Sequence, residues 1–375
     1  MKIYLVTGAA GFIGVNFVKY MLEKYGKSIQ IIVLDKLTYA GNKDSLKDEI
    51  SENKIEFVKG DIGNRELVEN IFSRYDIDYV VNFAAESHVD RSILGPKVFL
   101  ETNILGTQNL LEVSKDSWTI GKDENGYPIY KEGKKYIQIS TDEVYGSLSR
   151  DYIEAKELHL DEGVKKVVEG RDNLKTYGDK FFTEETPLDP RSPYSSSKAS
   201  GDMIVRAYAE TYKLPINITR CSNNYGPYQF PEKLIPVVIS KALRNEKIPV
   251  YGTGENVRDW IHVIDHNIGV DLIVRNGKVG EVYNLGGHSE RTNLTIVKTI
   301  LKQLGKSEDL IEFVADRKGH DLRYAIDSTK AEKELGWTRT YTFEEGIKET
   351  IDWYLNNTEW IDNILSGEYK EAYKD

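Results

Sequence analysis

A glycine-rich turn near the N-terminus constrains the fold of this chain more than any other feature of its sequence. The apolar run Ile3 to Val6 suits a buried parallel strand, and apolar residues then recur at helical spacing from residue 12 to 22. Gly8, Gly11 and Gly14 lie between the two. Glycines at such a turn allow tight backbone geometry, and the N–H groups at the start of the helix attract a phosphate. The segment therefore predicts the first strand and helix of a nucleotide-binding sheet.

The next strand ends in an acid that bears on the choice of nucleotide. The segment IQIIVLD reads as a second strand and ends at Asp35. An acid about 20 residues beyond the glycines holds a ribose 2'-hydroxyl and repels a 2'-phosphate, which favours NAD over NADP. A glycine turn that binds no nucleotide is the alternative. The joint placement of strand, helix and Asp35 favours NAD binding.

Strands and helices continue to alternate along the first 140 residues. Residues 54–62, 78–85 and 135–140 read as strands, while residues 66–75 and 96–114 read as helices. This order implies right-handed crossovers and a parallel sheet covered on both faces. We therefore expect an α/β fold with an open, doubly wound sheet.

Ligands of such sheets bind beyond the carboxyl ends of the strands. Several polar or small residues occur at these predicted ends, and their position alone makes them candidates for the cofactor edge: Asp61, Ile62, Ala84, Ala85, Glu86, Ser87, Ser140 and Thr141.

The alternation stops after Gly146. Residues 147–183 are rich in charge, and apolar residues at 160, 164, 167 and 168 suggest one amphipathic helix within them. The prolines of residues 183–193 favour extended or turn-like backbone. We interpret the segment as a surface excursion, either a lid or an inert insertion.

Tyr194 and Lys198 lie four residues apart on a predicted helix and therefore share one face. A tyrosine phenol ordinarily has a pKa of about 10, so it acts as a base at neutral pH only when a nearby cation favours the phenolate. Lys198 is spaced to supply that cation. Such a pair is also common on solvated helix faces, and the glycine turn, Asp35 and Thr141 favour the catalytic interpretation.

Size and composition limit the remaining choices. The 375 residues suffice for about two domains. The net charge of -10 disfavours nucleic acid and anionic membranes as partners, and no apolar run approaches the ~20 residues of a membrane span. Cys221 is the one cysteine and no charged-then-apolar leader precedes the first strand, so we expect a cytoplasmic protein. The histidines, including His262 and His266, show no zinc-binding pattern, so we expect no metal.

These motifs resemble those of the extended short-chain dehydrogenases, which have a Rossmann-type sheet and a smaller C-terminal substrate domain. Within them, the chain is similar to the dTDP-glucose 4,6-dehydratases over nearly its whole length. The closer resemblance is carried by the stretches LDKLTYAGN, AAESHVDRSI, ISTDEVYG, SPYSSSKAS, CSNNYGPYQFPEKLIP, VRDWIHVIDH and GHDLRYAID.

The resemblance implies a reaction and roles for the catalytic residues. Tyr194, with Lys198 beside it, would take the proton of the glucose C4 hydroxyl near Thr141 while the C4 hydride passes to NAD. Glu143 would then remove the C5 proton, and Asp142, arriving protonated, would donate to the departing C6 hydroxyl. The hydride would return to C6, so that NAD is regenerated.

The resemblance also implies two sets of binding residues. The cofactor set comprises Gly8, Gly11, Phe12, Ile13, Gly14, Asp35, Lys36, Leu37, Thr38, Asp61, Ile62, Ala84, Ala85, Glu86, Thr102, Tyr194, Lys198 and Asn224. The substrate set comprises Ser87, Thr141, Asn223, Lys233, Leu234, Pro249, Val250, Tyr251, Arg258, Asn293, Asp316 and His320. Lys233 and Arg258 are cations of the kind that a diphosphate requires in so acidic a chain.

The resemblance further implies an NAD-binding domain over residues 1–225 and a nucleotide-sugar domain over residues 226–375. A segment near 260–285 would return to the first domain. Homodimers would form through the helices at 96–114 and 193–213. Lys318 stands where the family usually has proline.

The segment STDEVYG also carries a geometric condition. Neighbouring side chains of a strand point to opposite faces, so Asp142 and Glu143 face one sugar only if the chain leaves strand geometry at about Thr141. Ser140 or Thr141 is a suitable N-cap for a short helical turn through residues 142–145. Three alternatives remain: the acids only cap a helix, the chain is a dehydratase or 4-epimerase of another nucleotide sugar, with uridine in place of thymidine, or it is a non-catalytic NAD-sensing protein.

Overall fold

The structure is a computed structural model that describes residues 1–148, 181–316 and 320–367. It consists of two compact units, each built from three segments of the chain. Unit 1 comprises residues 1–144, 188–220 and 267–283, and unit 2 comprises the described parts of residues 145–187, 221–266 and 284–375. The helix expected within 147–183 and Lys318 lie outside the described residues. The domain boundaries expected at residues 225 and 226 stay a prediction about ligand roles.

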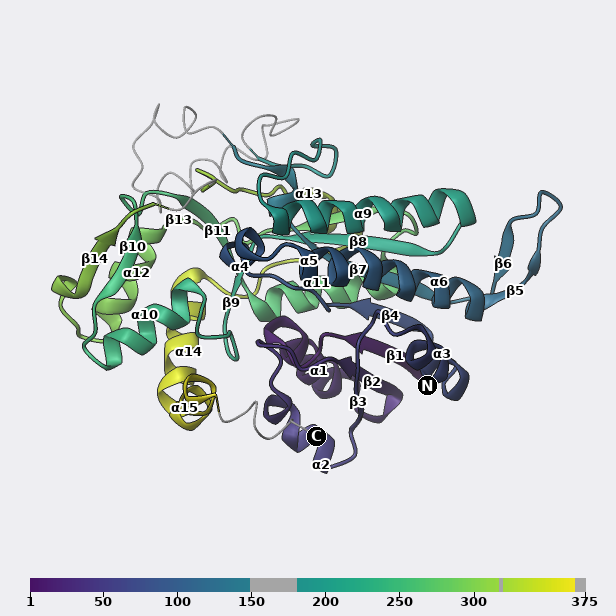
Figure 1. Cartoon of the computed structure of the whole chain (residues 1–375), viewed down its shortest axis with the longest axis horizontal. Coiled ribbons are helices and arrows are strands. Elements are labelled where there is room, and N and C mark those ends of the chain that lie inside the picture. The colour runs from purple at the N-terminus through teal and green to yellow at the C-terminus, as the bar shows by residue number, and fades with distance from the viewer. Residues whose placement is uncertain (149–180, 317–319, 368–375) are drawn as a thin grey trace. The chain divides into compact units, whose positions relative to one another are not determined.

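Unit 1 is built on a seven-stranded sheet in the order β12-β8-β7-β4-β1-β2-β3 (Figure 1). Strands β3, β2, β1, β4 and β7 pair in parallel, each with its neighbour in the sheet. The doubly wound α/β fold is therefore confirmed. The strands are β1 (Lys2–Thr7), β2 (Ile29–Asp35), β3 (Ile55–Lys59), β4 (Tyr79–Asn82), β7 (Lys135–Thr141), β8 (Ile216–Cys221) and β12 (Val282–Leu285).

Helices connect these strands. They are α1 (Phe12–Tyr25), η1 (Gly26–Ser28), η2 (Lys43–Leu46), α2 (Lys47–Ser51), α3 (Arg65–Arg74), α4 (Val89–Leu94), α5 (Lys97–Leu100), η3 (Glu101–Gly106), α6 (Thr107–Trp118), η4 (Asp142–Tyr145), α9 (Pro193–Tyr212) and α11 (Val263–Asn276). The η3 segment is a turn of π-helix, so the helix expected at 96–114 is divided by a π-turn and continues to Trp118.

The fourth strand is shorter than expected. It ends at Asn82 and not at residue 85, because its neighbour β1 ends at Thr7, where Gly8 turns the chain away with φ +65°. Residues 83–85 lose β1 as a neighbour and leave strand geometry, although β7 on the other side continues to Thr141. The sequence also gave no sign of the hairpin formed by β5 (Thr119–Lys122) and β6 (Pro128–Tyr130) (Figure 1).

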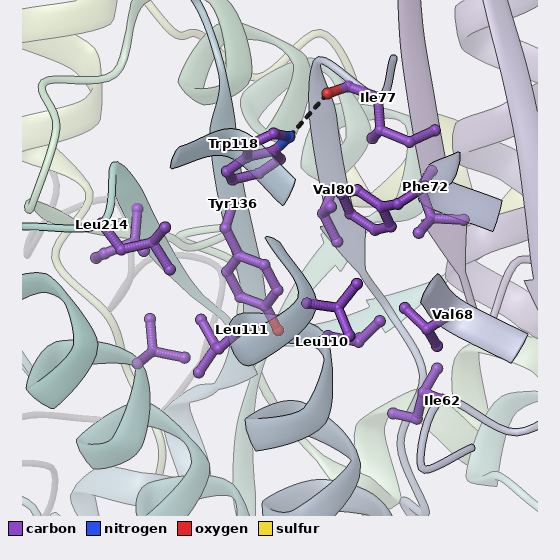
Figure 2. Packing of buried hydrophobic residues seen from close by; sticks show 14 of the residues in the cluster. Ile62, Val68, Phe72, Ile77, Val80, Leu110, Leu111, Trp118, Tyr136 and Leu214 are labelled. Carbon is purple, nitrogen blue, oxygen red and sulfur yellow. Dashed lines mark hydrogen bonds between the residues drawn. The ribbon is translucent and has the colours of Figure 1, made fainter. Parts of the chain in front are cut away.

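The core of unit 1 contains apolar side chains from the sheet and from the helices that follow its strands. Figure 2 shows Phe72 of α3, Val80 of β4 and Leu111 of α6 gathered in this cluster. Trp118 lies beside them, and its Nε1 donates a hydrogen bond of 2.9 Å to the carbonyl oxygen of Ile77. This bond fixes the end of α6 to the chain just before β4. The core thereby joins the sheet to helices α3 and α6.

Unit 2 combines two small sheets with helices. Its strands are β9 (Asn223–Tyr225), β10 (Ile248–Tyr251), β11 (Val257–His262), β13 (Glu290–Thr292) and β14 (Ile311–Val314), arranged as β13-β11-β9 and β10-β14. Its helices are α10 (Leu234–Leu243), α12 (Asn293–Gln303), η7 (Glu308–Leu310), α13 (Thr329–Leu335), α14 (Phe343–Asn356) and α15 (Thr358–Ser366). Apolar residues of α10, α12 and α14 form its core with β10.

Candidate functional site

The glycine turn of unit 1 packs so closely against neighbouring backbone that two of its glycines have no room for a side chain. A Cβ on Gly8 would lie 2.5 Å from the backbone N of Ala84, and one on Gly14 would lie 2.6 Å from the Cα of Ala9. Gly11 is the N-cap of α1 and provides no side-chain cap. The first N–H groups of α1, next to Phe12 and Ile13, are therefore free of a capping side chain. This cradle fits the diphosphate of a dinucleotide.

Asp35 lies beside that cradle, at the end of β2. Its Oδ2 accepts a hydrogen bond of 2.9 Å from the backbone N of Ala10, and its Oδ1 accepts one of 2.7 Å from the backbone N of Leu37. Burial raises the pKa of the Asp35 carboxyl, while these two backbone bonds oppose that shift. Leu37 has φ +56°, a conformation that few side-chain-bearing residues adopt. The backbone of residues 35–38 is therefore shaped around this carboxylate.

Asp61 and Ile62, after β3, differ in what they offer to a ligand. The Asp61 side chain accepts hydrogen bonds from Lys36 Nζ at 2.7 Å and from the backbone N of Gly63 at 2.8 Å. Although partial burial opposes it, the bond from Lys36 holds the pKa of Asp61 below its usual range. The Ile62 side chain is part of the core, so only its backbone is left for a cofactor.

A buried asparagine in the π-turn holds the loop after β4. Asn103 Oδ1 accepts from the backbone N of Glu86 at 3.0 Å, and its Nδ2 donates to the carbonyl oxygen of Glu86 at 3.0 Å. The same Nδ2 donates to Ser197 Oγ at 2.8 Å, on the helix that carries the Tyr-Lys pair. Asn103, which no sequence motif marks, thus holds Glu86 and with it the loop that carries Ala84, Ala85 and Ser87. Thr102 directly precedes it in the chain.

The STDEVYG segment leaves strand geometry where we expected. Strand β7 ends at Thr141, and residues 142–145 form the 3-10 turn η4. Thr141 Oγ1 accepts from the backbone N of Glu143 and donates to Asp142 Oδ1, both at 3.3 Å. Asp142 is only 2% exposed, whereas Glu143 is half-buried. The predicted turn is confirmed, and Thr141 acts as its cap.

Helix α9 presents Tyr194 and Lys198 to the carboxyl end of β7. Ser192 and Ser195 form a capping box at its start, which fixes the first turn. The backbone N of Tyr194 donates to Ser92 Oγ at 3.2 Å. The buried Lys198 Nζ donates to the carbonyl oxygen of Ile139 at 2.6 Å, two residues before Thr141. A cation and a phenol therefore stand on the helix bonded to the strand that leads into the acid pair.

A buried ion pair lies behind this strand end. Ser140 Oγ donates to Asp202 Oδ2 at 3.0 Å, and Arg220 Nε donates to the same oxygen at 2.9 Å. Asp202 lies on α9 and Arg220 on β8. The pair fixes the residue before Thr141 from two other elements of the fold.

Unit 2 contains the predicted nucleotide-sugar residues in three groups, of which the first lies on β9 and at the start of α10. Asn223 and Asn224 lie on β9, and the Asn224 side chain donates to the carbonyl oxygen of Ser222 at 3.0 Å and pairs with His266 Nδ1 at 2.9 Å. Lys233 is the N-cap of α10, and Leu234 begins that helix. Asn223 begins β9 and Lys233 directly precedes α10, so both residues lie at the start of an element.

The second group surrounds β10. Tyr251 is exposed and packs edge-on against His320 with ring centroids 6.4 Å apart, and His320 Nδ1 pairs with Asp316 Oδ1 at 2.6 Å. Pro249 shares the face of Tyr251, because alternate residues of β10 are buried. The Val250 side chain points into the core instead, so any contact of Val250 with a base falls to its backbone.

Arg258 on β11 and Asn293 at the start of α12 form the third group. The buried Arg258 guanidinium donates to the carbonyl oxygens of Val257 at 2.8 Å and Asp321 at 3.0 Å, and it stacks over the Tyr324 ring at 4.2 Å. These bonds hold the cation in one orientation. Asn293 begins α12, and its backbone N donates to the carbonyl oxygen of Asn256 at 3.1 Å.

Comparisons with known proteins agree with this geometry. Residues 4–286 match the NAD dependent epimerase/dehydratase family. The chain belongs to that family. It is 46% identical to a dTDP-glucose 4,6-dehydratase of Xanthomonas campestris pv. campestris over 379 residues, which cover 99% of this chain and 98% of the relative.

Two solved dTDP-glucose 4,6-dehydratases have the same fold. The Bacillus anthracis enzyme in complex with NAD is 46% identical with a TM-score of 0.80, and the match covers 97% of this chain and all of that one. The Streptomyces venezuelae enzyme, solved with NAD and another ligand, is 40% identical with a TM-score of 0.82, covering 96% and 99%. Within the family, the chain thus groups with the dTDP-glucose 4,6-dehydratases.

The residues that hold the site in place have weak signals in the sequence. Gly201 on α9 hinted at close packing, since a Cβ there would lie 2.7 Å from the Asn103 carbonyl oxygen. Nothing local marked Asn103, Asp202 or Arg220. Among residues 1–148, 181–316 and 320–367, no group of acids, histidines and cysteine is arranged to hold a metal ion. In the same ranges, no helix has the length and apolarity to cross a membrane.

Proposed function

We propose that this chain is a dTDP-glucose 4,6-dehydratase, which converts dTDP-glucose to dTDP-4-keto-6-deoxyglucose and water. The observation that carries the proposal is the turn after β7, where Thr141, Asp142 and Glu143 follow a strand bonded to Lys198. Relatives that are 40% to 46% identical over nearly the whole chain bear this activity in their names.

The cofactor is NAD, held at the glycine cradle of β1 and α1. Gly8 and Gly14 allow the close backbone packing of the turn, and the uncapped N–H groups at the start of α1 suit a diphosphate. The Asp35 carboxylate at the end of β2 suits a ribose hydroxyl and repels a 2'-phosphate. When bound, NAD supplies a hydride acceptor for C4 of the sugar and a hydride donor for C6. The solved relatives contain NAD, which supports the same choice here.

The first half of the reaction needs a base for the C4 hydroxyl. Tyr194 takes that proton as the phenolate, and the buried Lys198 cation stabilises the negative charge. Thr141 lies where its hydroxyl can orient the C4 oxygen. The product of this half is a 4-ketone, which acidifies the proton on C5.

The second half needs an acid and a base in opposite protonation states. Glu143 removes the C5 proton as a carboxylate, and Asp142 donates a proton to the C6 hydroxyl, which leaves as water. The protonated Glu143 then returns a proton to C5 when C6 receives its hydride. Burial of Asp142 beside Glu143 favours the neutral, proton-donating form of Asp142.

The nucleotide part of the substrate binds to unit 2. Lys233 and Arg258 meet the diphosphate through charge-assisted hydrogen bonds. They supply the local positive charge that an anionic ligand needs in a chain of net charge -10. Tyr251 and His320 contact the base, and we propose thymidine as the preferred nucleoside.

The proposal is tested by incubating purified, NAD-supplied protein with dTDP-glucose and measuring the 4-keto-6-deoxy product by its absorbance in alkali. We expect this product, and its absence refutes the proposal. Formation of dTDP-galactose would identify a 4-epimerase instead, and NAD binding without turnover would identify a sensing protein. A parallel reaction with UDP-glucose measures the base preference.

Variants test the assigned roles. We expect Asp142→Asn and Glu143→Gln each to lower kcat by roughly 10²–10⁴-fold while NAD affinity stays unchanged. Glu132→Gln, which alters an exposed acid in the loop before β7, is the matched control. Wild-type rates for both site variants would contradict the acid and base roles.

We also propose a homodimer and a cytoplasmic location. Exposed apolar side chains gather on α4, α5, η3 and α9, which contact one another in unit 1. They are Ile93, Leu94, Val98, Leu100, Leu105 and Met203. Large exposed apolar surfaces of this kind mark interfaces. The single cysteine, Cys221, is buried and has no second cysteine in the sequence with which to form a disulfide, which suits a reducing compartment.

A further inference from the structure

Unit 2 contains a cavity of about 360 Å³ that no predicted cofactor or substrate residue lines. Its volume lies within the ~300–1,000 Å³ typical of small-molecule sites. Aromatic rings form much of its wall: Tyr225, Trp260, His262, Tyr341 and Phe343. The His262 and Tyr341 rings lie 3.9 Å apart by their centroids, and Tyr225 packs edge-on against His262 at 5.4 Å. The cavity therefore has flat aromatic faces, with polar side chains beside them.

Polar atoms in the same wall have no partner. Trp260 Nε1, both ring nitrogens of His262, and Ser289 Oγ are buried and lack a hydrogen-bond partner within the described part of the chain. Trp260 is 5% exposed and His262 is 2% exposed. Buried polar groups are seldom left unpaired, because each has lost its hydrogen bonds to water. Donors and acceptors at the edge of aromatic faces are what a heterocyclic ring would pair with.

The charged groups around the cavity are already paired. Arg291 Nη2 donates to Glu344 Oε1 at 3.0 Å, and Arg339 Nη1 donates to Glu332 Oε1 at 3.1 Å. Asp265, also in the wall, accepts from the backbone N of Thr340 at 2.7 Å. The charge of Arg291 is thus balanced by Glu344, and that of Arg339 by Glu332. Burial also lowers the pKa of His262 to about 4, so its ring is neutral at pH 7.

We propose that this cavity is an accessory binding site for an uncharged heterocycle of nucleobase or nucleoside size. Its flat walls stack on the ring, and Trp260, His262 and Ser289 supply one donor, one donor-acceptor pair and one hydroxyl for the ring's polar edge. The balanced charges disfavour a diphosphate, which distinguishes this site from the proposed substrate site. Trp260 and Arg258 lie on the same strand, β11, so an occupant would contact the strand that carries the predicted diphosphate ligand.

The test uses NAD-loaded protein with a saturating concentration of dTDP, so that the proposed substrate site is filled. Thymidine, uridine, cytidine, adenosine and guanosine are added singly, and binding is measured by saturation-transfer NMR and isothermal titration calorimetry. We expect at least one nucleoside to bind saturably, with an affinity that dTDP does not change. A titration of dTDP alone reports separately on the proposed substrate site, so the two proposals fail independently.

Two variants locate the binding. Trp260→Phe keeps an aromatic ring and removes the Nε1 donor, and Ser289→Ala removes the hydroxyl, so each should weaken nucleoside binding roughly three- to tenfold. Trp353→Phe alters a tryptophan of unit 2 outside the cavity and should leave the affinity unchanged. The inference is overturned when no nucleoside binds, when neither cavity variant weakens binding, or when a crystal soaked with the bound nucleoside shows only water in the cavity.

Discussion

Removal of Arg220 should destabilise this protein far more than removal of a surface cation. Arg220 and Asp202 pair at 2.9 Å with side chains that are 2% and 0% exposed. An Arg220→Met substitution leaves the Asp202 charge buried, with a hydrogen bond from the Ser140 hydroxyl in place of an ion pair. Breaking a buried pair in this way costs about 3–5 kcal/mol. For 375 residues, whose unfolding entropy is about 2.1 cal/mol/K each, that cost corresponds to a fall in melting temperature of roughly 4–6 °C.

A double variant separates the loss of stability caused by the unpaired charge from the loss caused by altered packing. In the double variant Asp202→Asn with Arg220→Met, no charge is buried, and the amide that replaces the Asp202 carboxylate retains an acceptor for Ser140. Replacing both members of a buried pair is often close to neutral, so we expect the double variant to recover most of the lost stability. Because Ser140 precedes Thr141, the single variant should also lower kcat, and the double variant should restore it in part.

The assay is thermal unfolding followed by circular dichroism, with kcat measured on the same preparations. Lys348→Met is the control, since Lys348 pairs with Asp352 at 2.9 Å while their side chains are 72% and 52% exposed. Exposed pairs contribute about 0–1 kcal/mol, so this control should melt within about 1–2 °C of wild type. An Arg220→Met protein that melts with the control would refute the reasoning.

Three further predictions concern the cofactor cradle, acid stability and assembly. Gly14→Ala places a methyl group against the backbone of the glycine turn and should lower NAD affinity at least tenfold by calorimetry, whereas Gly121→Ala, with open space around it, should not. Burial lowers the pKa of His266 to about 3, so its contribution to stability is complete above pH ~6.5 and is lost as the pH falls towards 3. In urea unfolding over that window, wild type should lose about 1.4 kcal/mol per pH unit more than His266→Gln, and parallel slopes would disprove this assignment. Leu105→Lys combined with Met203→Lys should convert the proposed dimer to monomer in light scattering, and an unchanged mass would reject this face as the interface.

Features governed by local rules could be predicted from the sequence. The second strand has the predicted bounds, Ile29–Asp35, because a continuous apolar run and a terminal acid specify it without reference to distant residues. The turn at residues 142–145 was predicted for a similar reason. Two acids that must serve one substrate cannot stay in a strand, and Thr141 is a suitable cap.

Features that depend on a neighbouring element could not be predicted in the same way. The end of β4 at Asn82 is set by the point where β1 turns at Gly8, and neither segment contains that information alone. The hairpin at 119–130 lies in a stretch without clear strand alternation, so its pairing becomes visible only in three dimensions. The aromatic cavity of unit 2 combines β11 with the chain before α14, about 80 residues later.

The same distinction separates reacting residues from positioning residues. Thr141, Asp142 and Glu143 are contiguous, and their chemistry is legible in a short motif. The groups that hold them are distant: Ser140 and Asp202 are 62 residues apart, and Asn103 and Ser197 are 94 apart. A site of this kind requires its reacting atoms to be held to within fractions of an ångström by such supporting bonds. Substitutions in the support should therefore alter kcat and stability together, whereas conservative substitutions of the acids should alter kcat alone.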